Sequence, residues 1–414
     1  MNQPYFEAIT DALHNAGICT PTLVLDKERL DRNIDHLIDV LNKGFDYRLI
    51  TKSLPSVPLL QYVMRRTGTQ RLMCTHLPFL KQLVSHVPSA DILMGKPFPI
   101  RAVRHFYDWH QQQNACACFA PEMQLQWLID SPERLQDYET FASERNLNLR
   151  ISLELDVGLH RGGFRRSSDL VEAVNFIGRS RHLTLTSLMG YEAHIPKMPG
   201  YLGGPAKAFA DAKGRYLNFI RAIEDELGSE ALLQLTLNTG SSTTYSLYAE
   251  SSHASEISAG AALIKPLSLD ITDDEERQPS AFIAAPVLRK VSKPEVPLSP
   301  ALSALCRAIG ILPRNAAYIY GGNWIAQPCY PEGAQRVRLH GRSSNQELYG
   351  LTAGTRLGED DFLFFRPRHT AAVFQQFGQI AVYDNGRITD WWPVYRDQEG
   401  QSTPLESSRR LTIV

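Results

Sequence analysis

The sequence lacks an excess of charge, a block of like charges and a long apolar run. Lys and Arg together number 43 against 44 Asp and Glu, which gives a formal net charge of -1. This balance does not favour nucleic acid, a membrane surface or a polyanion as partner. The first residues lack the basic start and apolar run of a signal peptide, and no segment reaches membrane-spanning length. The sequence therefore predicts a cytoplasmic protein.

Cysteine is scarce and unpatterned, with six residues and no repeated CxxC pair. In a chain of 414 residues this favours free thiols over a disulfide framework. The only close pair, Cys116 and Cys118, has no further Cys or His at ligand spacing. We therefore expect residues 114–120 to form a buried strand rather than a soft-metal site.

A glycine-rich dinucleotide fingerprint is also missing after the first predicted strand, which argues against an open doubly wound sheet. From residue 20 onward short apolar strands alternate with amphipathic helices, and the number of strands is near eight. The pattern therefore predicts an α/β fold with a parallel (β/α)8, TIM-like barrel over residues 20–266. Residues 20–26 are predicted to be its first strand.

After residue 266 the pattern changes to strand-like runs with Gly and Pro turns. We expect a second, mostly antiparallel β domain over residues 267–414, with residues 1–19 as a candidate segment to pack on it. One helix is predicted near residues 299–312. The run Asp384-Asn385-Gly386 predicts a hairpin turn.

The segment FDYRLITKSLPS, residues 45–56, reads as a buried strand that ends by presenting Lys52. In a parallel barrel the residue just past a strand end points into the mouth, where ligands bind. A partly desolvated lysine loses its proton more readily and can attack an aldehyde. Lys52 is therefore a candidate anchor for an aldehyde cofactor, although a lysine at a strand end is more often solvated.

Later strand ends carry further polar groups. Arg161 follows one strand, Tyr191 and His194 follow another, and a Gly/Ser/Thr-rich loop ends a third. Such a loop, like the small-residue turn around Gly260 after the next strand, offers backbone N–H groups and hydroxyls to a phosphate. The candidate phosphate-binding residues are Asn238, Gly240, Ser241, Ser242, Thr243, Gly260 and Ala261. Together with Lys52 and Arg161 these residues suit pyridoxal 5'-phosphate (PLP).

The order and spacing of these segments resemble the fold-type III, alanine-racemase-like PLP enzymes, in particular the D-threonine aldolase and D-serine dehydratase group. The resemblance extends from TPTLVLD and TKS through ELDVGLHRGGF, GYEAH, NTGSSTTY and EISAGAAL to the C-terminal RPRHTAAV. It implies that Lys52 forms the Schiff base and that Arg161 lies near the phenolic oxygen of the cofactor. It also implies that Tyr191 lies near the ring and that His194 is the base for the substrate β-hydroxyl.

Simpler structural roles remain open for the same residues. Arg161 could pair with Asp156 or Glu154, His194 could be a hydrogen-bonded structural histidine, and Tyr191 could be part of the core. The Gly/Ser/Thr loop could be a plain turn.

Two positions depart from the pattern of the group. Ser258 stands where alanine racemases have an arginine facing the pyridine nitrogen, and a neutral partner there weakens the ring as an electron sink. In the C-terminal metal motif His369 is kept, but Ala371 replaces the second ligand. One imidazole is a poor divalent-ion site, so we expect a metal-free enzyme.

The resemblance predicts a PLP-dependent lyase, either an aldolase or a dehydratase, acting on a D-configured or 3-hydroxy amino acid. It also implies a homodimer. An amino-acid racemase or epimerase is the main alternative, with Tyr320, Tyr349 or Cys329 of a partner subunit as a candidate second acid. A non-catalytic PLP-binding protein is a further alternative, which the presence of a second domain disfavours.

Overall fold

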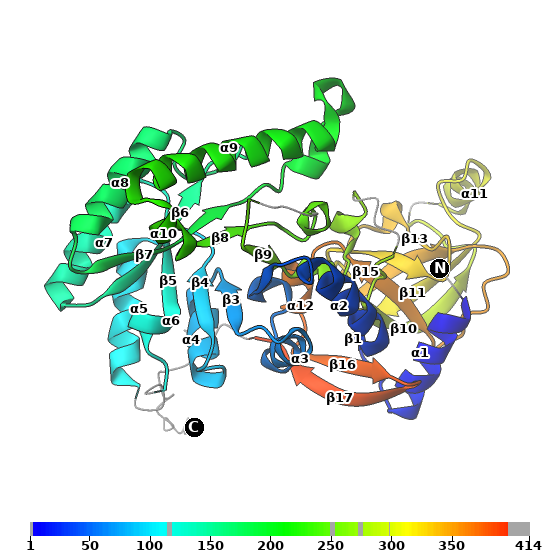
Figure 1. Cartoon of the computed structure of the whole chain (residues 1–414). Coiled ribbons are helices and arrows are strands. Elements are labelled where there is room, and N and C mark those ends of the chain that lie inside the picture. Colours follow the sequence, from blue (N-terminus) through cyan, green and yellow to red (C-terminus); the bar gives the residue numbers. More distant parts are fainter. Residues whose placement is uncertain (1–2, 114–117, 249–252, 272–275, 298, 396–414) are drawn as a thin grey trace, which may run out of the picture.

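The computed structural model describes residues 3–113, 118–248, 253–271, 276–297 and 299–395. Eight parallel strands close into a barrel that forms the left part of Figure 1, confirming the predicted fold class. In order these strands are β2 (Asp46–Ile50), β3 (Arg71–Cys74), β4 (Asp91–Met94), β5 (Leu125–Ile129), β6 (Leu149–Leu155), β7 (Leu183–Gly190), β8 (Thr236–Thr239) and β9 (Glu256–Ala259).

Helices cover the outside of the barrel, and the long helix α9 runs along its top in Figure 1. Their apolar faces pack on the strands in one continuous core. The helices that follow the barrel strands are α3 (Val57–Thr67), α4 (Leu77–His86), α5 (Ile100–Gln112), α6 (Pro121–Gln124), α7 (Pro132–Arg145), α8 (Ser167–Arg179), α9 (Gly204–Leu227) and α10 (Ser229–Leu233).

One sequence-based assignment of a barrel strand is wrong, and a second lies partly outside the described residues. Residues 20–26 do not open the barrel: β1 (Thr22–Asp26) belongs to the second sheet, and Lys52 therefore follows the first barrel strand rather than the second. Every residue of β1 is buried, so its apolar pattern does not show which of the two sheets it joins. The strand expected at 114–120 lies partly outside the described residues, and the fourth barrel strand is β5 instead.

The second domain is a nine-stranded, mostly antiparallel sheet, as predicted. The strand order is β13-β14-β11-β10-β1-β16-β17, and β15 joins β10 to β12. Besides β1, its strands are β10 (Ala281–Ser292), β11 (Asn315–Tyr320), β12 (Ala326–Tyr330), β13 (Gln335–Arg336), β14 (Gln346–Leu351), β15 (Phe362–Pro367), β16 (Gln379–Asp384) and β17 (Arg387–Pro393).

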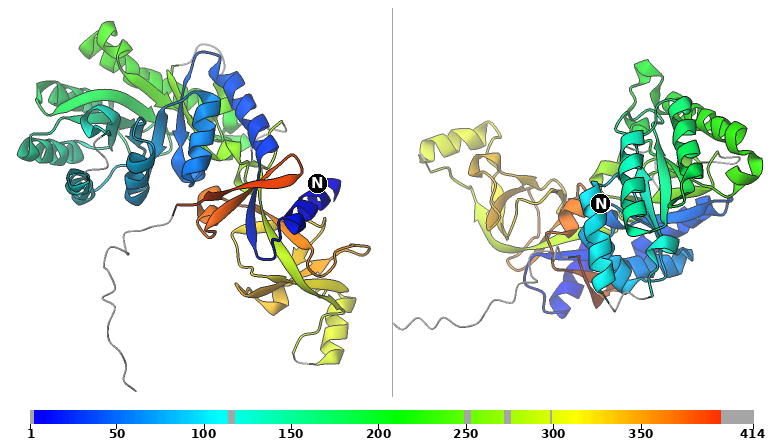
Figure 2. Two further views of the ribbon diagram at one scale, coloured as in Figure 1. Left: turned by 90° about the horizontal axis from the view of Figure 1, so that it is seen from below. Right: turned by 90° about the vertical axis from the view of Figure 1, so that its left-hand side faces the viewer.

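The N-terminal segment contributes to the sheet domain and connects it to the barrel. β1 pairs with β10 and β16, and helix α2 (Lys27–Leu41) leads from it to the barrel. Helix α1 (Gln3–Asn15) buries Phe6, Ile9 and Leu13 in the same cluster as Phe282 and Phe364 of the sheet. Both views of Figure 2 show the sheet domain as a separate lobe beside the barrel.

The remaining local expectations for the second domain are met. Helix α11 (Pro300–Ala308) is the predicted helix, and the side chain of Ser299 caps its N-terminus. β16 and β17 form the predicted hairpin, in which Asn385 and Gly386 both have positive φ. Positive φ at both positions is the requirement of a type I′ turn. Among the described residues no helix has both the length and the apolar character that a membrane crossing requires.

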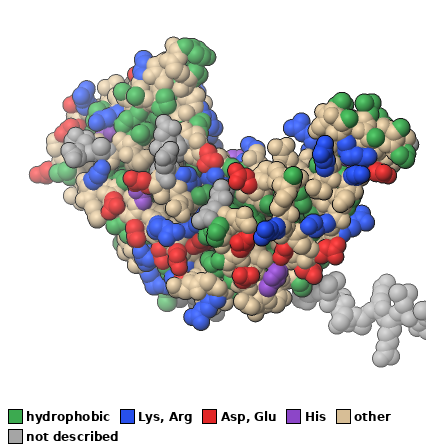
Figure 3. Space-filling view, turned by 90° about the vertical axis from the view of Figure 1, so that its right-hand side faces the viewer, with side chains coloured by type: hydrophobic (Ala, Val, Ile, Leu, Met, Phe, Trp, Pro, Cys, Tyr) green, Lys and Arg blue, Asp and Glu red, His purple; other side chains and the backbone are tan. Residues whose placement is uncertain are grey.

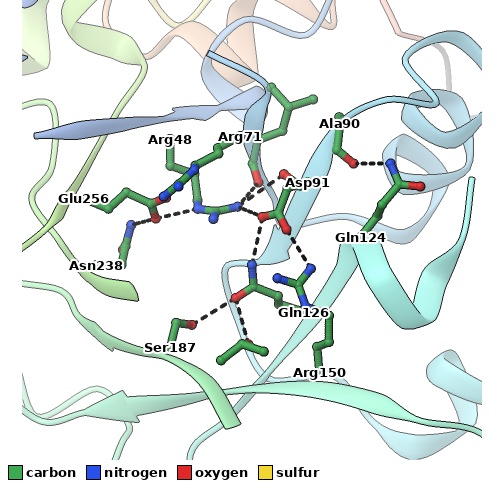
Figure 4. A network of polar contacts seen from close by, with 12 residues as sticks. Arg48, Arg71, Ala90, Asp91, Gln124, Gln126, Arg150, Ser187, Asn238 and Glu256 are labelled. Carbon is green, nitrogen blue, oxygen red and sulfur yellow. Dashed lines mark hydrogen bonds and ion pairs between the residues drawn. The ribbon is translucent and has the colours of Figure 1, made fainter. Parts of the chain in front are cut away.

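A buried network of charges fills the N-terminal end of the barrel (Figure 4). Arg48 on β2 is 1% exposed and bonds Glu256 on β9 at 2.6 Å and Asp91 on β4 at 2.8 Å. Arg71 and Asn238 also donate to Glu256. β2 and β9 are the first and last barrel strands, so the Arg48–Glu256 pair spans the seam that closes the barrel.

Glu256→Gln is expected to destabilise the protein by about 3–5 kcal/mol, because it leaves the buried Arg48 without its main counter-charge. The shift of the urea unfolding midpoint, converted with the measured slope, gives this value. The matched control is Asp211→Asn, which removes an exposed ion pair to Lys207 and is expected to cost less than about 1 kcal/mol. Equal effects of the two substitutions would contradict a structural role for the seam pair.

Candidate active site

A cavity of about 400 Å³ lies at the C-terminal end of the barrel, where the loops after the strands meet the start of helix α12 (Thr370–Phe374). Lys52, Arg161, Lys197 and His369 line it, and no Asp or Glu does so within the described part of the chain. A lining that has cations but no carboxylates favours an anionic ligand. The predicted residues Tyr191, Asn238, Gly240, Ser241, Ser242, Thr243, Ser258 and Ala261 also line this cavity.

Lys52 lies in a one-turn 3-10 helix (Thr51–Ser53) directly after β2. The pKa of its ammonium group lies below the usual range, first because the surrounding protein removes water from it and then because Arg161 and Lys96 are close. A lowered pKa increases the fraction of neutral amine at a given pH. That is the form that attacks a carbonyl group.

Arg161 contacts two groups beside the cavity. Its guanidinium donates to Glu154 at 3.2 Å, and its Cζ lies 4.6 Å from the centre of the Tyr191 ring. Burial raises the pKa of Glu154, and Arg161 offsets part of that rise. Burial likewise raises the pKa of Tyr191, which Arg161 also offsets in part. Arg161 therefore pairs with Glu154 and lines the cavity at the same time.

The predicted phosphate-binding segments lie side by side. The backbone N–H of Gly260 donates to Ser242 Oγ at 3.1 Å, which ties the turn after β9 to the loop after β8. A Cβ at Gly260 would lie 2.7 Å from the carbonyl oxygen of Ile50, so only glycine permits this close approach to the strand that leads to Lys52. Gly260 itself does not line the cavity, whereas Ala261 does.

Asn238 and Ser258 form the part of the cavity wall that connects to the charge network. The Asn238 amide donates to Glu256 at 2.6 Å and to Ser258 Oγ at 2.8 Å. Its NH₂ group must face the Glu256 carboxylate, which accepts only. Ser258 thus acts as an acceptor towards Asn238, and its own hydroxyl proton remains available towards the cavity.

His194 does not line the cavity, although its neighbours Tyr191 and Ala193 do. Its Nε2 would lie 3.2 Å from a Cβ at Gly158, and its Nδ1 is buried without a hydrogen-bond partner. Burial lowers the pKa of His194, and the nearby His160 and Arg215 lower it further. His194 thus lies outside the lining of the cavity that Lys52 reaches, and its expected role as the base for the substrate β-hydroxyl stays a prediction.

The segment of the family metal motif does reach the cavity, where both His369 and Ala371 line the wall. A divalent ion needs several oxygen, nitrogen or sulfur ligands. Within the described part of the chain, no group of three or more His, Cys, Asp or Glu could hold such an ion. Of the two motif positions only His369 carries a side chain that can bind an ion, because Ala371 has no ligand atom.

The comparisons with known proteins agree with this geometry. The family "Alanine racemase, N-terminal domain" matches residues 25–266, so the chain belongs to this family of fold-type III, PLP-dependent proteins. No curated protein sequence matches the chain.

Solved structures share the fold over almost the whole chain. A D-threonine aldolase from Filomicrobium marinum superposes with a TM-score of 0.71 at 14% identity, covering 90% of this chain and 94% of that one. A D-threo-3-hydroxyaspartate dehydratase from Delftia sp. HT23 gives 0.68 at 17% identity, covering 91% and 97%. An alanine racemase from Bacillus anthracis gives 0.66 at 12% identity, covering 90% and 97%. At such identities the likeness shows the fold alone.

Two residues near the site were missed by the sequence reasoning. Lys197 lines the cavity from the loop after β7, but a single exposed lysine in a loop carries no sequence signal. Glu192 is buried behind the Gly/Ser/Thr loop and bonds Thr239 and Thr244. The sequence does show that Glu192 follows a buried strand, between Tyr191 and Ala193. A carboxylate that is buried there needs several hydrogen-bond donors.

Gly260→Ala is expected to lower the free energy of unfolding by about 1–3 kcal/mol, because the new methyl group meets a backbone oxygen that cannot move freely. The control is Gly178→Ala in helix α8, where a Cβ meets nothing within 4 Å. There alanine is expected to stabilise by about 0.5–1 kcal/mol. Chemical unfolding of both variants tests the difference in sign. A neutral Gly260→Ala variant would contradict the close approach.

Arg161→Gln is expected to raise the pKa of Lys52, because it removes one of the two positive charges that lower it. The neutral amine is the reactive form. The midpoint of the pH profile for modification of Lys52 by a small amine-reactive reagent is therefore expected to move to higher pH. Peptide mass spectrometry measures the modification at each pH. The control is Arg166→Gln, an exposed arginine paired with Asp169, which is expected to leave the profile unchanged.

Proposed function

We propose that this protein is a PLP-dependent lyase that acts on a D-configured or 3-hydroxy amino acid. The observation that carries this proposal is that Lys52, whose pKa is lowered, lies across one cavity from the Gly/Ser/Thr loop and the turn after β9, with no Asp or Glu of the described residues in the lining. Membership of a PLP-dependent family supports the choice of cofactor.

Each wall of the cavity has a role in this proposal. Lys52 holds the cofactor and exchanges protons at the substrate α-carbon, and Arg161 orients the cofactor ring together with Tyr191. Backbone N–H groups and hydroxyls of the loop 240–243 and of Ala261 hold the phosphate. When bound, PLP supplies an electron-withdrawing ring that weakens the bonds at the α-carbon. Ser258 would offer that ring a neutral group from the cavity wall.

The proton of a substrate hydroxyl also needs an acceptor. The sequence prediction assigned this role to His194, but His369 is the histidine that lines the cavity. Residues of α12 lie close to the turn that carries Lys52. Within this proposal we therefore place His369, and not His194, beside the substrate side chain, and no divalent ion takes part.

We also propose a homodimer. The tip of the sheet domain exposes Leu305, Ile309 and Ile311, which are 57%, 60% and 52% exposed. Figure 3 shows hydrophobic side chains gathered on this projecting lobe, next to basic ones. Apolar side chains gathered on one exposed tip are typical of a protein interface. A second copy of the chain is the partner that this family suggests.

The protein as purified or after addition of PLP is expected to absorb at roughly 410–430 nm, and borohydride is expected to abolish the band. Peptide mapping then finds the pyridoxyl group on Lys52, and Lys52→Ala loses both the band and the label. The control is Lys197→Ala, which removes the second cavity lysine and is expected to keep both the band and the label on Lys52. A wild-type spectrum that stays empty with added PLP would contradict the proposal.

The products formed from D-amino acids identify the reaction. Glycine with an aldehyde indicates an aldolase, and a keto acid with ammonia indicates a dehydratase. Loss of optical activity without a change of mass indicates the racemase, the second candidate, whose fold this chain shares.

His369→Ala is expected to lower turnover by about 10²-fold or more, and His194→Ala by much less. Activity that survives dialysis against a chelator is expected, and retention of one equivalent of a divalent ion would reject the metal-free assignment.

A further inference from the structure

Glu192 is a buried carboxyl group behind the phosphate-binding loop, and its side chain is 1% exposed. Thr244 Oγ1 donates to one of its oxygens at 2.6 Å, and Thr239 Oγ1 donates to the other at 3.1 Å. The Thr239 proton is committed to Glu192, so Tyr248 donates its hydroxyl proton to Thr239 Oγ1 at 2.7 Å. Burial raises the pKa of Glu192, and the hydrogen bonds from Thr244 and Thr239 offset part of that rise. Within the described part of the chain no Lys, Arg or His pairs with it. Its charge is therefore offset by hydrogen-bond donors alone.

This carboxylate fixes the direction of the neighbouring hydrogen bonds. A carboxylate only accepts, so the single hydroxyl proton of Thr244 is committed to Glu192. The 2.9 Å contact between Ser241 Oγ and Thr244 Oγ1 then requires Ser241 to donate. Ser241 Oγ is left as an acceptor, which it is already for the backbone N–H of Thr243 at 3.2 Å.

The next two hydroxyls in the loop remain available to a ligand. Ser242 Oγ accepts from the Gly260 N–H at 3.1 Å, so its own proton is uncommitted, and Ser242 lines the cavity. The Thr243 hydroxyl lies 2.9 Å from Ser241 Oγ and can turn to a ligand oxygen, because Ser241 keeps the Thr243 N–H as a donor. Ser241 lines the cavity as well but has no proton to give.

We propose that Glu192 is a positioning residue for the phosphate of the ligand. By holding Thr244 it commits the Ser241 proton to Thr244, so that Thr243, and not Ser241, donates to the phosphate oxygens. Ser242, whose proton does not depend on Glu192, donates beside it. The proposal rests on the proposed function for the identity of the ligand as PLP. Of the predicted phosphate-binding residues, it selects those whose hydroxyl group has a proton to donate.

The test compares PLP with pyridoxal, which has the same ring and aldehyde but no phosphate. Glu192→Gln introduces an amide that donates on one side, and it is expected to weaken PLP binding about tenfold or more. Pyridoxal binding, followed by the same change in absorbance, is expected to change less than about twofold. The matched control is Glu154→Gln, whose partner Arg161 is not part of the loop, and which is expected to change both affinities by the same factor.

Two further variants keep the test independent of the folding of Glu192→Gln. Thr244→Val keeps the size of the side chain and removes the first hydroxyl of the chain, and the same selective loss for PLP is expected. Ser242→Ala is expected to lose more PLP affinity than Ser241→Ala, since of these two hydroxyls only that of Ser242 donates to the phosphate.

The outcomes separate this inference from the proposed function. Equal losses for PLP and pyridoxal, or no loss in Glu192→Gln and Thr244→Val, would overturn the inference and leave the PLP assignment standing. If the wild type binds inorganic phosphate by calorimetry but not PLP, the proposed function fails, and a weaker phosphate affinity of Glu192→Gln still supports the inference. A wild type that binds neither contradicts both.

Discussion

The seam between β2 and β9 is the constraint on which the site depends. The register places Arg48 beside Ser258, and the buried ion pair between Arg48 and Glu256 spans the seam below the cavity. Continuing along the two strands, the chain reaches Lys52 on one side and the turn at Gly260 on the other. Parallel strands in register deliver their C-terminal ends to the same level. Closing the barrel therefore also brings the lysine and the phosphate-binding turn to one cavity.

Charge is distributed unequally around this seam. Carboxylates lie behind the cavity wall, where Glu256 and Glu192 are bonded by several donors, and none lines the cavity within the described residues. A buried carboxylate that accepts hydrogen bonds obliges its partners to donate to it. Asn238 donates to Ser258, so the Ser258 proton stays available to the cavity. Thr244 accepts the Ser241 proton, so the Thr243 hydroxyl is free to donate to a ligand. The cavity thus presents cations and hydroxyl protons to its ligand, which is the polarity that a phosphate needs.

Much of the fold and most of the site could be predicted from the sequence, since each barrel strand that leads to a predicted site residue has an apolar core followed by small or polar residues. Lys52, Arg161, Tyr191 and the loop 240–243 follow such strand ends and do line one cavity. The placement of β1 could not be predicted, because a fully buried strand has the same pattern in either sheet. His194 does not line the cavity, although it follows the same strand as Tyr191, because spacing alone does not show which side chains of a turn face a cavity. The direction of the hydroxyl hydrogen bonds around Glu192 could not be predicted either, because it depends on contacts between residues that are distant in the sequence.

The most direct test of the account is a crystal structure of the protein soaked with PLP. The account predicts continuous electron density from Lys52 Nζ to a phosphate group held by the loop 240–243 and the turn at Gly260, with Arg161 and Tyr191 beside the ring. A phosphate bound elsewhere, or PLP attached to another lysine such as Lys197, would contradict the claim that the β2–β9 seam assembles the site.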